Sequence, residues 1–253
     1  MKRLHLFCLF LLAAVVQPAL AASPEAEAII AKARAFIGGD AALDAVNSIH
    51  ITGVLEVEET PANPNTPGKS SIEIIFQKPA HHLLTVRTAQ YVETTGLDDY
   101  FSWRRVEPTD GGRAQNAGLG ASGTKRLRAS AWENLFFYRA AEKHGGDVID
   151  QGLADVDGIR CRKILFTYGP GMEYLRYFDV ETGRLVQTET PPSGLIREEG
   201  EIIVSGVRFP RVLKTYRTED GKRIVVTVTF ENIVLNKQFP PETFEQPLLR
   251  GIR

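Results

Sequence analysis

Cysteine is almost missing from the sequence, and the two cysteines, Cys8 and Cys161, lie far apart. Cys8 falls in an N-terminal segment that we expect to be removed, which leaves Cys161 alone. An intramolecular disulfide is then excluded even in an oxidising compartment. Stability must come from a hydrophobic core, for which a chain of 253 residues with 43% apolar content suffices, as one large β domain or two small ones.

An excess of charge of either sign is also missing, because the chain has 30 basic and 31 acidic residues. Removal of Lys2 and Arg3 with the N-terminal segment leaves 28 basic residues against 31 acidic ones. Binding of nucleic acid or an anionic membrane as the main partner favours a basic patch. The charge balance therefore argues against both as the main partner.

No hydrophobic run is long enough to span a bilayer. Leu4–Val16 is mostly apolar but falls short of the roughly 18 to 20 residues that a membrane-spanning helix needs. It follows two basic residues and precedes Ala19-Leu20-Ala21, a small-x-small cleavage site. We predict that residues 1–22 are a signal peptide cleaved after Ala21 or Ala22, and that the mature chain has no permanent membrane span. A retained membrane anchor is the alternative interpretation.

An amphipathic helix is predicted at the start of the mature chain. Apolar residues recur from Ala26 to Ile37 at the spacing of one helical face. Ser23 can cap the N-terminus with Pro24 at the first helical position, and Gly38-Gly39 can end the helix. The polar face carries Glu25, Glu27, Lys32 and Arg34. A second short helix, Ala41–Val46, is expected to follow, with Asp40 as its cap.

From Ser48 onward the hydrophobic period changes to two, which predicts a series of strands. Turn signals such as Asp157-Gly158 and Ser205-Gly206 join many of them as hairpins. The predicted strands are 48–58, 72–77, 81–87, 91–95, 100–106, 148–154, 159–168, 172–180, 185–190, 196–204, 207–218 and 223–235. A proline-rich loop, Glu59–Ser70, interrupts the series, and the tail Asn236–Pro247 is expected along an edge.

The middle of the chain has a different composition. Thr109–Gly123 is rich in glycine and polar residues, which predicts a mobile loop. Thr124–Lys143 is the second strong helix prediction, ended by His144-Gly145-Gly146. We therefore expect a mainly β (α+β) fold, an antiparallel meander of about 11 strands that buries one face under two main helices.

A curled sheet with helices in its mouth would leave a cleft lined with hydrocarbon and aromatic groups, which suits a lipid or acyl chain. The candidate cleft residues are Phe76, Tyr91, Phe101, Trp103, Trp132, Phe136 and Phe137. The alternative is that these side chains form a sealed core. Arg126 and Arg128, at the start of the second helix, are candidates for contact with a lipid headgroup, and a solvated face is the alternative there.

Signals for catalysis or a metal are weak. His81 and His82 are neighbours on a predicted strand and should point to opposite faces, so we expect no metal site. The same argument separates Glu198 from Glu199, while Glu58-Glu59 and Asp98-Asp99 fall at strand ends or turns. Cys161 lies between two arginines that can lower its pKa, although a passive strand residue is the simpler reading. We expect no catalytic residue and no cofactor.

Several motifs in order along the chain carry a family resemblance. They are Ile29-Ile30-Ala31-Lys32, Gly38-Gly39, Ala42-Leu43, Ser48-Ile49 with Gly53, Tyr177-Phe178-Asp179 with Thr182-Gly183, Gly206–Pro210, Phe230–Ile233, and Asn236–Phe244 with Pro247. With these motifs the sequence resembles outer-membrane lipoprotein-sorting proteins, the LolA/LolB-like superfamily. The resemblance covers most of residues 23–253, which we expect to form one LolA/LolB-like lipid-binding domain.

The resemblance implies an unclosed β-barrel with helices packed in its concave face. It further implies a periplasmic protein that binds a lipid or the acyl chain of a lipoprotein. We expect a non-catalytic carrier that acts as a monomer, with an envelope protein as a possible donor or acceptor. Two other classes stay open. One is a structural or protein-interaction module, such as an envelope sensor, whose barrel is filled by its own side chains. The other is a periplasmic enzyme with an acid or base in the cleft.

Overall fold

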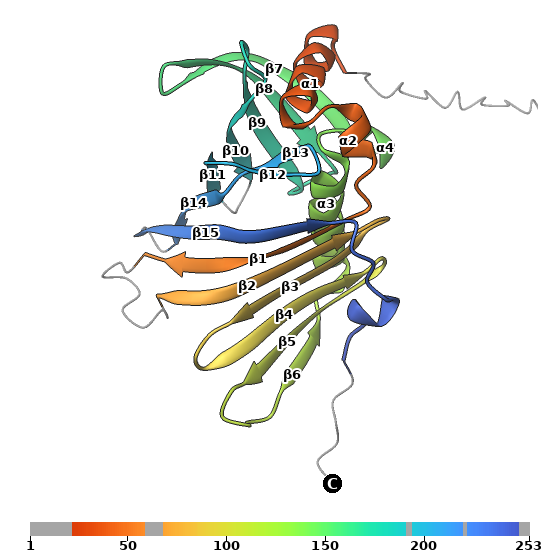
Figure 1. The fold of residues 1–253 in the computed structure, drawn as a ribbon, viewed down its shortest axis with the longest axis vertical. Coiled ribbons are helices and arrows are strands. Elements are labelled where there is room, and N and C mark those ends of the chain that lie inside the picture. Colours follow the sequence, from red (N-terminus) through yellow and green to blue (C-terminus); the bar gives the residue numbers. More distant parts are fainter. Residues whose placement is uncertain (1–21, 59–67, 191–193, 220–221, 248–253) are drawn as a thin grey trace, which may run out of the picture.

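One antiparallel sheet of 13 strands dominates the computed structural model (Figure 1). Its order is β6-β5-β4-β3-β2-β1-β15-β14-β11-β10-β9-β8-β7, and β12 and β13 form a separate hairpin. The two edge strands, β6 and β7, do not pair with each other, so the sheet is not closed into a barrel. The expectation of a mainly β fold with an unclosed antiparallel sheet is therefore confirmed.

The structure describes residues 22–58, 68–190, 194–219 and 222–247. The strands are β1 Ser48–Val57, β2 Lys69–Gln77, β3 His81–Arg87, β4 Tyr91–Asp98, β5 Phe101–Pro108, β6 Gln115–Gly118, β7 Asp147–Val156, β8 Ile159–Thr167, β9 Glu173–Asp179, β10 Leu185–Thr190, β11 Gly194–Glu199, β12 Ile202–Val204, β13 Val207–Phe209, β14 Val212–Glu219 and β15 Lys222–Leu235. The predicted signal peptide lies outside the described residues except for Ala22, as does the predicted loop up to residue 67.

The helices are α1 Pro24–Ile37, α2 Asp40–Asp44, α3 Gly120–Phe136 and α4 Ala140–Lys143, with a 3-10 turn, η1, at Pro241–Thr243. The ends of α1 follow the local sequence: the Ala26 amide donates to Ser23 Oγ at 3.1 Å, and Gly38 adopts a φ of 145° after the last turn. No helix among the described residues is long and apolar enough to cross a membrane.

Three expectations about element boundaries were wrong. The predicted loop 109–123 contains β6 and the start of α3, and the predicted helix 124–143 is divided into α3 and α4. The predicted strands 196–204 and 207–218 are each divided, which produces the extra hairpin β12–β13. A kink at Gly200, with a φ of 63°, separates β11 from β12.

The division of the second helix has a tertiary cause. Phe137 and Tyr138 adopt positive φ angles of 45° and 72°. The Arg34 guanidinium donates to the carbonyl oxygens of Phe136 and Phe137 at 3.2 and 2.9 Å, which satisfies helix-end acceptors. Arg34 is only 3% exposed, so its predicted place on the polar face of α1 was wrong. It also binds Asp40, at 2.5 Å, which therefore does not act as the predicted cap.

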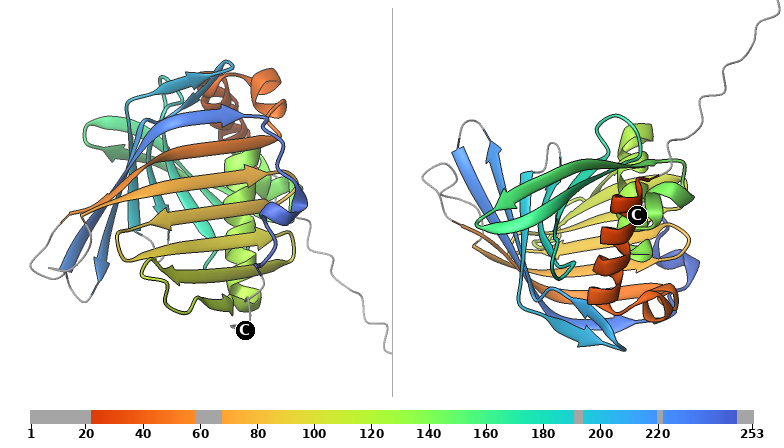
Figure 2. Two further views of the ribbon diagram at one scale, coloured as in Figure 1. Left: turned by 60° about the horizontal axis from the view of Figure 1, so that its bottom comes forward. Right: turned by 90° about the horizontal axis from the view of Figure 1, so that it is seen from above.

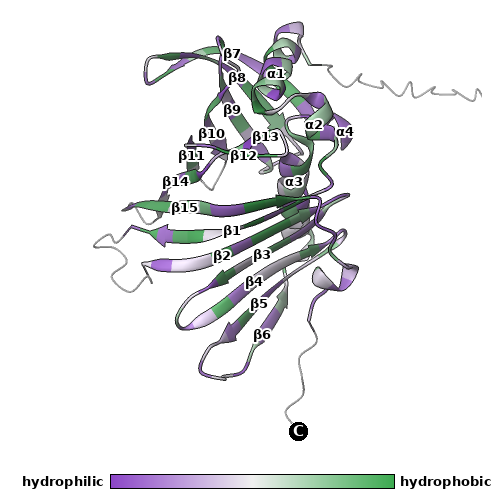
Figure 3. Ribbon diagram, viewed as in Figure 1, coloured by the Kyte–Doolittle hydropathy of each residue, from purple (hydrophilic) through white to green (hydrophobic). Residues whose placement is uncertain are grey.

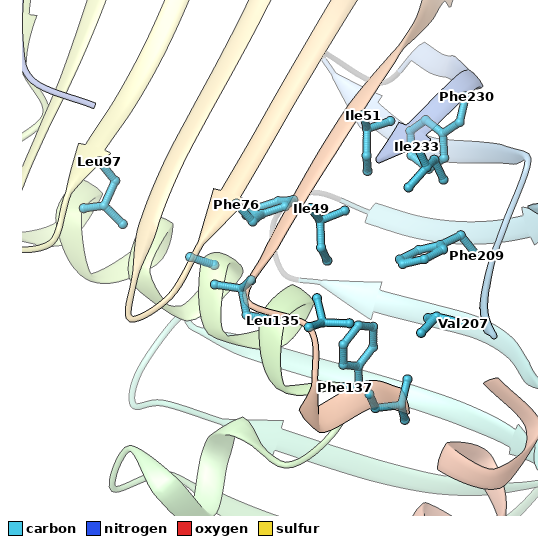
Figure 4. Packing of buried hydrophobic residues seen from close by; sticks show 13 residues of the cluster. Ile49, Ile51, Phe76, Leu97, Leu135, Phe137, Val207, Phe209, Phe230 and Ile233 are labelled. Carbon is cyan, nitrogen blue, oxygen red and sulfur yellow. The ribbon is translucent and has the colours of Figure 1, made fainter. Parts of the chain in front are cut away.

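Two apolar cores lie on the concave face of the sheet. In the first, Leu135 of α3 belongs to one cluster with Phe76 and Leu97 from the β1–β5 half (Figure 4). In the second, Ile30 of α1 belongs to a cluster with Phe166 and others from the β7–β10 half. Figure 2 shows the sheet curving around α1 and α3, and Figure 3 shows polar and apolar residues alternating along the strands. The helices therefore pack in the concave face, as expected.

The C-terminal tail crosses strand ends on one rim instead of lying along an edge. The Gln77 side chain pairs with the backbone of Phe239 at 3.0 and 3.1 Å. The indole of Trp103 donates to the Phe244 carbonyl at 2.8 Å, and the Asn116 amide donates to the Pro247 carbonyl at 2.7 Å. The tail therefore joins β2, β5 and β6 through hydrogen bonds.

Candidate functional site

A pocket of about 290 Å³ lies on the concave side, where the C-terminal end of α1 meets β10, the end of β11 and the β12–β13 hairpin. We call it the α1 pocket. It is lined by Phe36, Ile37, Tyr138, Arg184, Leu185, Glu198, Gly200, Glu201, Arg208, Phe209 and Pro210. The volume is close to the lower end of the range for small-molecule sites, which is about 300 to 1,000 Å³.

The α1 pocket has an apolar wall and charged groups. Ile37, Leu185 and Phe209 supply the hydrocarbon and aromatic surface. Arg208 forms an ion pair with Glu201, and its guanidinium lies 4.9 Å from the centre of the Phe36 ring. Such a combination can hold an apolar chain and a polar headgroup in one site.

A buried charged cluster lies next to the α1 pocket, and we call it the Arg176 cluster. Arg176 of β9 is 8% exposed and forms an ion pair with Glu133 of α3, which is 5% exposed. Glu133 also accepts a hydrogen bond from the Tyr168 hydroxyl. The Arg176 guanidinium lies 5.0 Å from the Tyr138 ring and 5.5 Å from the Tyr174 ring. The cluster links α3 to the β8–β9 half and supports Tyr138 on the pocket wall.

Burial sets the protonation of this cluster. Burial raises the pKa of Tyr138 and that of Tyr168, and the Glu133 carboxylate adds to the shift at Tyr168. Burial also raises the pKa of Tyr174, to about 12. Burial lowers the pKa of Arg176, but the Glu133 carboxylate, Tyr138 and Tyr168 together outweigh this and leave it raised. The tyrosines therefore stay neutral hydroxyl groups, and Arg176 stays charged.

Glu198 is the carboxyl group of the α1 pocket whose pKa is shifted. Its side chain is half-buried, and this burial raises its pKa from the ordinary value of 4.5 to about 7, while the positive charge of Arg176 opposes the shift. Near neutral pH a large fraction of Glu198 is therefore protonated, which lowers the negative charge of the pocket.

The Glu198→Gln variant should change how stability depends on pH. Between pH 4.5 and about 7 the folded wild type keeps a proton that the unfolded chain has lost, so its stability falls as pH rises through this window. Because Glu198 is partly exposed, we expect the free energy of unfolding of the wild type to fall by about 1–3 kcal/mol across this window relative to that of Glu198→Gln. Urea unfolding from pH 4 to 8 measures it. Glu199→Gln, an exposed neighbour, is the control, and parallel curves for wild type and Glu198→Gln would contradict the shift.

A second pocket, of about 550 Å³, lies on the outer face of the sheet. It is lined by Asp157, Ile159, Arg184, Val186, Leu195, Arg197, Glu198, Glu199, Tyr216 and Arg223. Arg197 pairs with Asp157 at 2.9 Å, and Glu199 pairs with Lys214 at 2.9 Å. This pocket is more polar than the α1 pocket, and two of its charged lining residues, Arg197 and Asp157, pair with each other, so we favour the α1 pocket as the candidate site.

The predicted cleft residues do not come together on one surface. Phe76 is 6% exposed and Phe137 is 8% exposed, and both lie in the first core (Figure 4). Tyr91 is half-buried at the start of β4, where it pairs with Pro108 of β5. Trp132 and Phe136 are half-buried on α3. None of the seven lines either of the two pockets described above, and their role in binding stays a prediction.

Trp103 and Phe101 lie on the opposite face of the sheet from α3. Trp103 pairs with Gly96, whereas its neighbour Ser102 faces inward, with its hydroxyl 2.8 Å from that of Thr124 in α3. Phe101 is two residues from Trp103, shares its face and is 48% exposed. The expectation that Trp103 and Phe101 line a cleft on the concave face is therefore wrong. The alternation of side chains along β5 shows which residues share a face of the sheet, but it does not show which face is concave.

The predicted headgroup residues differ from each other. Arg126 is exposed. Arg128 is half-buried, with its guanidinium 4.7 Å from the Tyr100 ring and 4.9 Å from the Trp132 ring. Neither arginine lines one of the two pockets.

The two neighbouring histidines point to opposite faces, as expected. His82 stacks on Phe76 in the core at 4.7 Å, where burial lowers its pKa to about 4, while His81 stacks on Phe244 of the tail at 4.8 Å.

The suggestion that the neighbouring arginines lower the pKa of Cys161 is wrong. Burial, and then the Asp179 carboxylate, raises the pKa of this thiol. Within the described ranges, no three His, Cys, Asp or Glu residues form a group that could hold a metal ion.

Sequence reasoning missed most of the α1 pocket and the Arg176 cluster. One signal was present in β9, where Arg176 stands between Tyr174 and Phe178 at a spacing of two. An arginine on the apolar face of a strand indicates a buried partner. No comparable signal marked Phe36, Arg208 or Phe209, because elements distant in sequence bring them together.

Comparison with known proteins identifies the fold. No family model matches the chain, and no curated protein matches it. Among solved structures, a DUF1329 family protein from Desulfovibrio piger aligns with a TM-score of 0.57 at 12% identity, covering 89% of this chain and 99% of that one. A LolA superfamily protein from Nitrosomonas europaea aligns with a TM-score of 0.53 at 12% identity, covering 87% and 97%. The chain therefore has the LolA-like fold, and the resemblance inferred from the motifs is confirmed at this level.

Proposed function

We propose that the protein binds a lipid, or the acyl chain of a lipoprotein, in the α1 pocket and acts as a non-catalytic carrier in the bacterial periplasm. The observation that carries this proposal is the α1 pocket itself, which combines apolar and charged lining groups on the concave face. The LolA-like fold and the signal-peptide pattern of residues 1–22 support the compartment.

The charges of the pocket suit an amphiphile with an anionic head. Arg184 and Arg208 supply two guanidinium groups, and Glu201 already pairs with Arg208. Glu198 loses much of its negative charge near pH 7 because burial raises its pKa to about 7. The apolar chain would lie against Ile37, Leu185 and Phe209, where its burial is favourable.

The first test is native mass spectrometry with solvent extraction, on protein purified from a periplasm without detergent. A lipid or acylated peptide at one copy per chain would support the carrier and identify its cargo. A protein that stays free of lipid after incubation with a membrane extract would contradict it.

The second candidate is a protein-interaction module with a self-filled interior. The filled first core favours it, because α3 covers the β1–β5 half with fully buried side chains such as Ala131 and Leu135. A lipid-free mass together with capture of a defined envelope protein would favour this module.

Ile37→Trp should block the α1 pocket. The larger indole would occupy space between α1 and the β12–β13 hairpin, and we expect affinity for a fluorescent fatty-acid probe to fall by about tenfold or more. Fluorescence titration measures this change. The matched control is Ile203→Trp, because Ile203 is 58% exposed and does not line the pocket. Equal affinities for both variants and the wild type, with unchanged unfolding midpoints, would exclude the α1 pocket as the probe site.

A further inference from the structure

Cationic and aromatic side chains contact one another along the outer side of α3, and we call this row the cation–aromatic ladder. It consists of Tyr100, Arg128, Trp132, His144, Phe136, Lys78 and Lys143. The Trp132 and His144 rings stack at 3.9 Å. The Nζ atoms of Lys78 and Lys143 lie 5.3 and 5.2 Å from the centre of the Phe136 ring.

Four separate segments build the ladder at one rim of the sheet. Arg128, Trp132 and Phe136 follow each other at a spacing of four, which forms one stripe along α3. The turn between β2 and β3 supplies Lys78, and the turn between β4 and β5 supplies Tyr100. The end of α4 supplies Lys143 and His144. Figure 2 shows α3 crossing the sheet near the ends of these strands.

The cations of this surface form no close ion pair with any residue that the structure describes. Among the described residues, no carboxylate lies within 4.0 Å of Lys78, Arg128 or Lys143, nor of Lys125 or Arg126 at the start of α3. Acids of the flanking segments pair elsewhere: Asp44 with Arg34, Asp98 with His81 and Glu142 with Arg139. Glu133, the acid within α3, points inward to Arg176.

The aromatic members are partly accessible. Tyr100 is 75% exposed, and Trp132 and Phe136 are half-buried. Aromatic rings and lysine or arginine side chains are the groups that proteins place at the headgroup level of a bilayer, where rings enter the interface and cations meet phosphate groups. The near-neutral charge of the whole chain hides this local excess of positive charge.

We propose that the cation–aromatic ladder docks the protein onto the anionic phospholipid surface of a bilayer. This inference goes beyond the proposed function, because it concerns a surface that does not line the α1 pocket and does not require that the pocket holds a lipid. Docking would present the outer side of α3, the two hairpin turns and the end of α4 to the membrane.

Co-sedimentation with lipid vesicles tests the proposal. The mature protein should bind vesicles with about 30% anionic phosphatidylglycerol in phosphatidylcholine, and binding should fall when NaCl is raised from about 0.1 to about 0.5 M. The double variant Lys78→Glu/Lys143→Glu should bind about tenfold or more weakly. The control Arg113→Glu/Arg160→Glu makes the same change in net charge at exposed residues outside the ladder and should bind within about twofold of the wild type.

Tryptophan fluorescence gives a second readout. Trp132 belongs to the ladder, whereas Trp103 is 1% exposed and serves as an internal reference. Anionic vesicles should shift the emission of the wild type to shorter wavelength, and Trp132→Phe should remove the shift. Absence of binding to anionic vesicles, equal binding to pure phosphatidylcholine vesicles, or an equal loss in both charge variants would overturn the proposal. Unchanged urea midpoints would show that the variants are folded.

Discussion

Arg176→Ala is expected to lower the free energy of unfolding by about 3–5 kcal/mol. The substitution leaves the Glu133 carboxylate buried, at 5% exposure, without its cationic partner. It also removes the guanidinium from among the rings of Tyr138, Phe166 and Tyr174, at 5.0, 5.1 and 5.5 Å. Urea unfolding measures the loss.

The control for this effect is an exposed ion pair. Arg104 pairs with Glu93 at 2.6 Å, but the Arg104 side chain is 50% exposed, so Arg104→Ala should cost about 0–1 kcal/mol. The double variant Arg176→Met/Glu133→Gln removes both buried charges and should recover part of the stability lost in Arg176→Ala. A loss below about 1 kcal/mol in Arg176→Ala would mean that the buried pair does not join α3 to the β8–β9 half.

Trp103→Ala is the second change with a large expected effect, a loss of about 3–5 kcal/mol. The indole is 1% exposed and lies against Gly96, where an added Cβ would be 2.3 Å from its Cε2 atom. Its N–H donates to the Phe244 carbonyl at 2.8 Å. Removal should therefore leave a cavity and also release the C-terminal tail from the strand ends.

Two measurements separate these effects. Urea unfolding reports the stability, and hydrogen exchange at the amides of Phe239 and Phe244 reports the attachment of the tail. Trp103→Phe keeps part of the packing without the hydrogen bond and should show faster exchange with a smaller loss of stability. Trp132→Ala, at a half-buried position, is the control and should not speed exchange in the tail. Equal exchange in Trp103→Ala and the wild type would mean that the indole does not hold the tail.

The proposed function and the proposed docking surface make separate demands on the molecule. The α1 pocket depends on the junction of α1, β10, β11, the β12–β13 hairpin and Tyr138, whereas the cation–aromatic ladder depends on α3, the end of α4 and the strand ends of the β1–β5 half. Ile37→Trp and Lys78→Glu/Lys143→Glu therefore test them independently. Binding of vesicles without binding of the fatty-acid probe would support the docking surface and contradict lipid binding in the α1 pocket.

Local sequence determined the features that depend on residues close together in the chain. Ser23, Pro24 and Gly38 set the ends of α1, because capping involves groups within one helical turn. Asp157-Gly158 formed the predicted turn, with φ angles of 53° and 80°. The period of two determined most strands and separated His81 from His82, because side chains alternate along a strand.

Only the tertiary structure decided the features that depend on distant partners. The end of α3 at Phe136 involves Arg34, which lies about one hundred residues earlier and donates to its carbonyl at 3.2 Å. The face of Trp103 depends on which side of the sheet becomes concave, and alternation within β5 carries no information about that side. The α1 pocket is the space left where five segments meet, so its volume depends on packing between side chains that no local pattern relates.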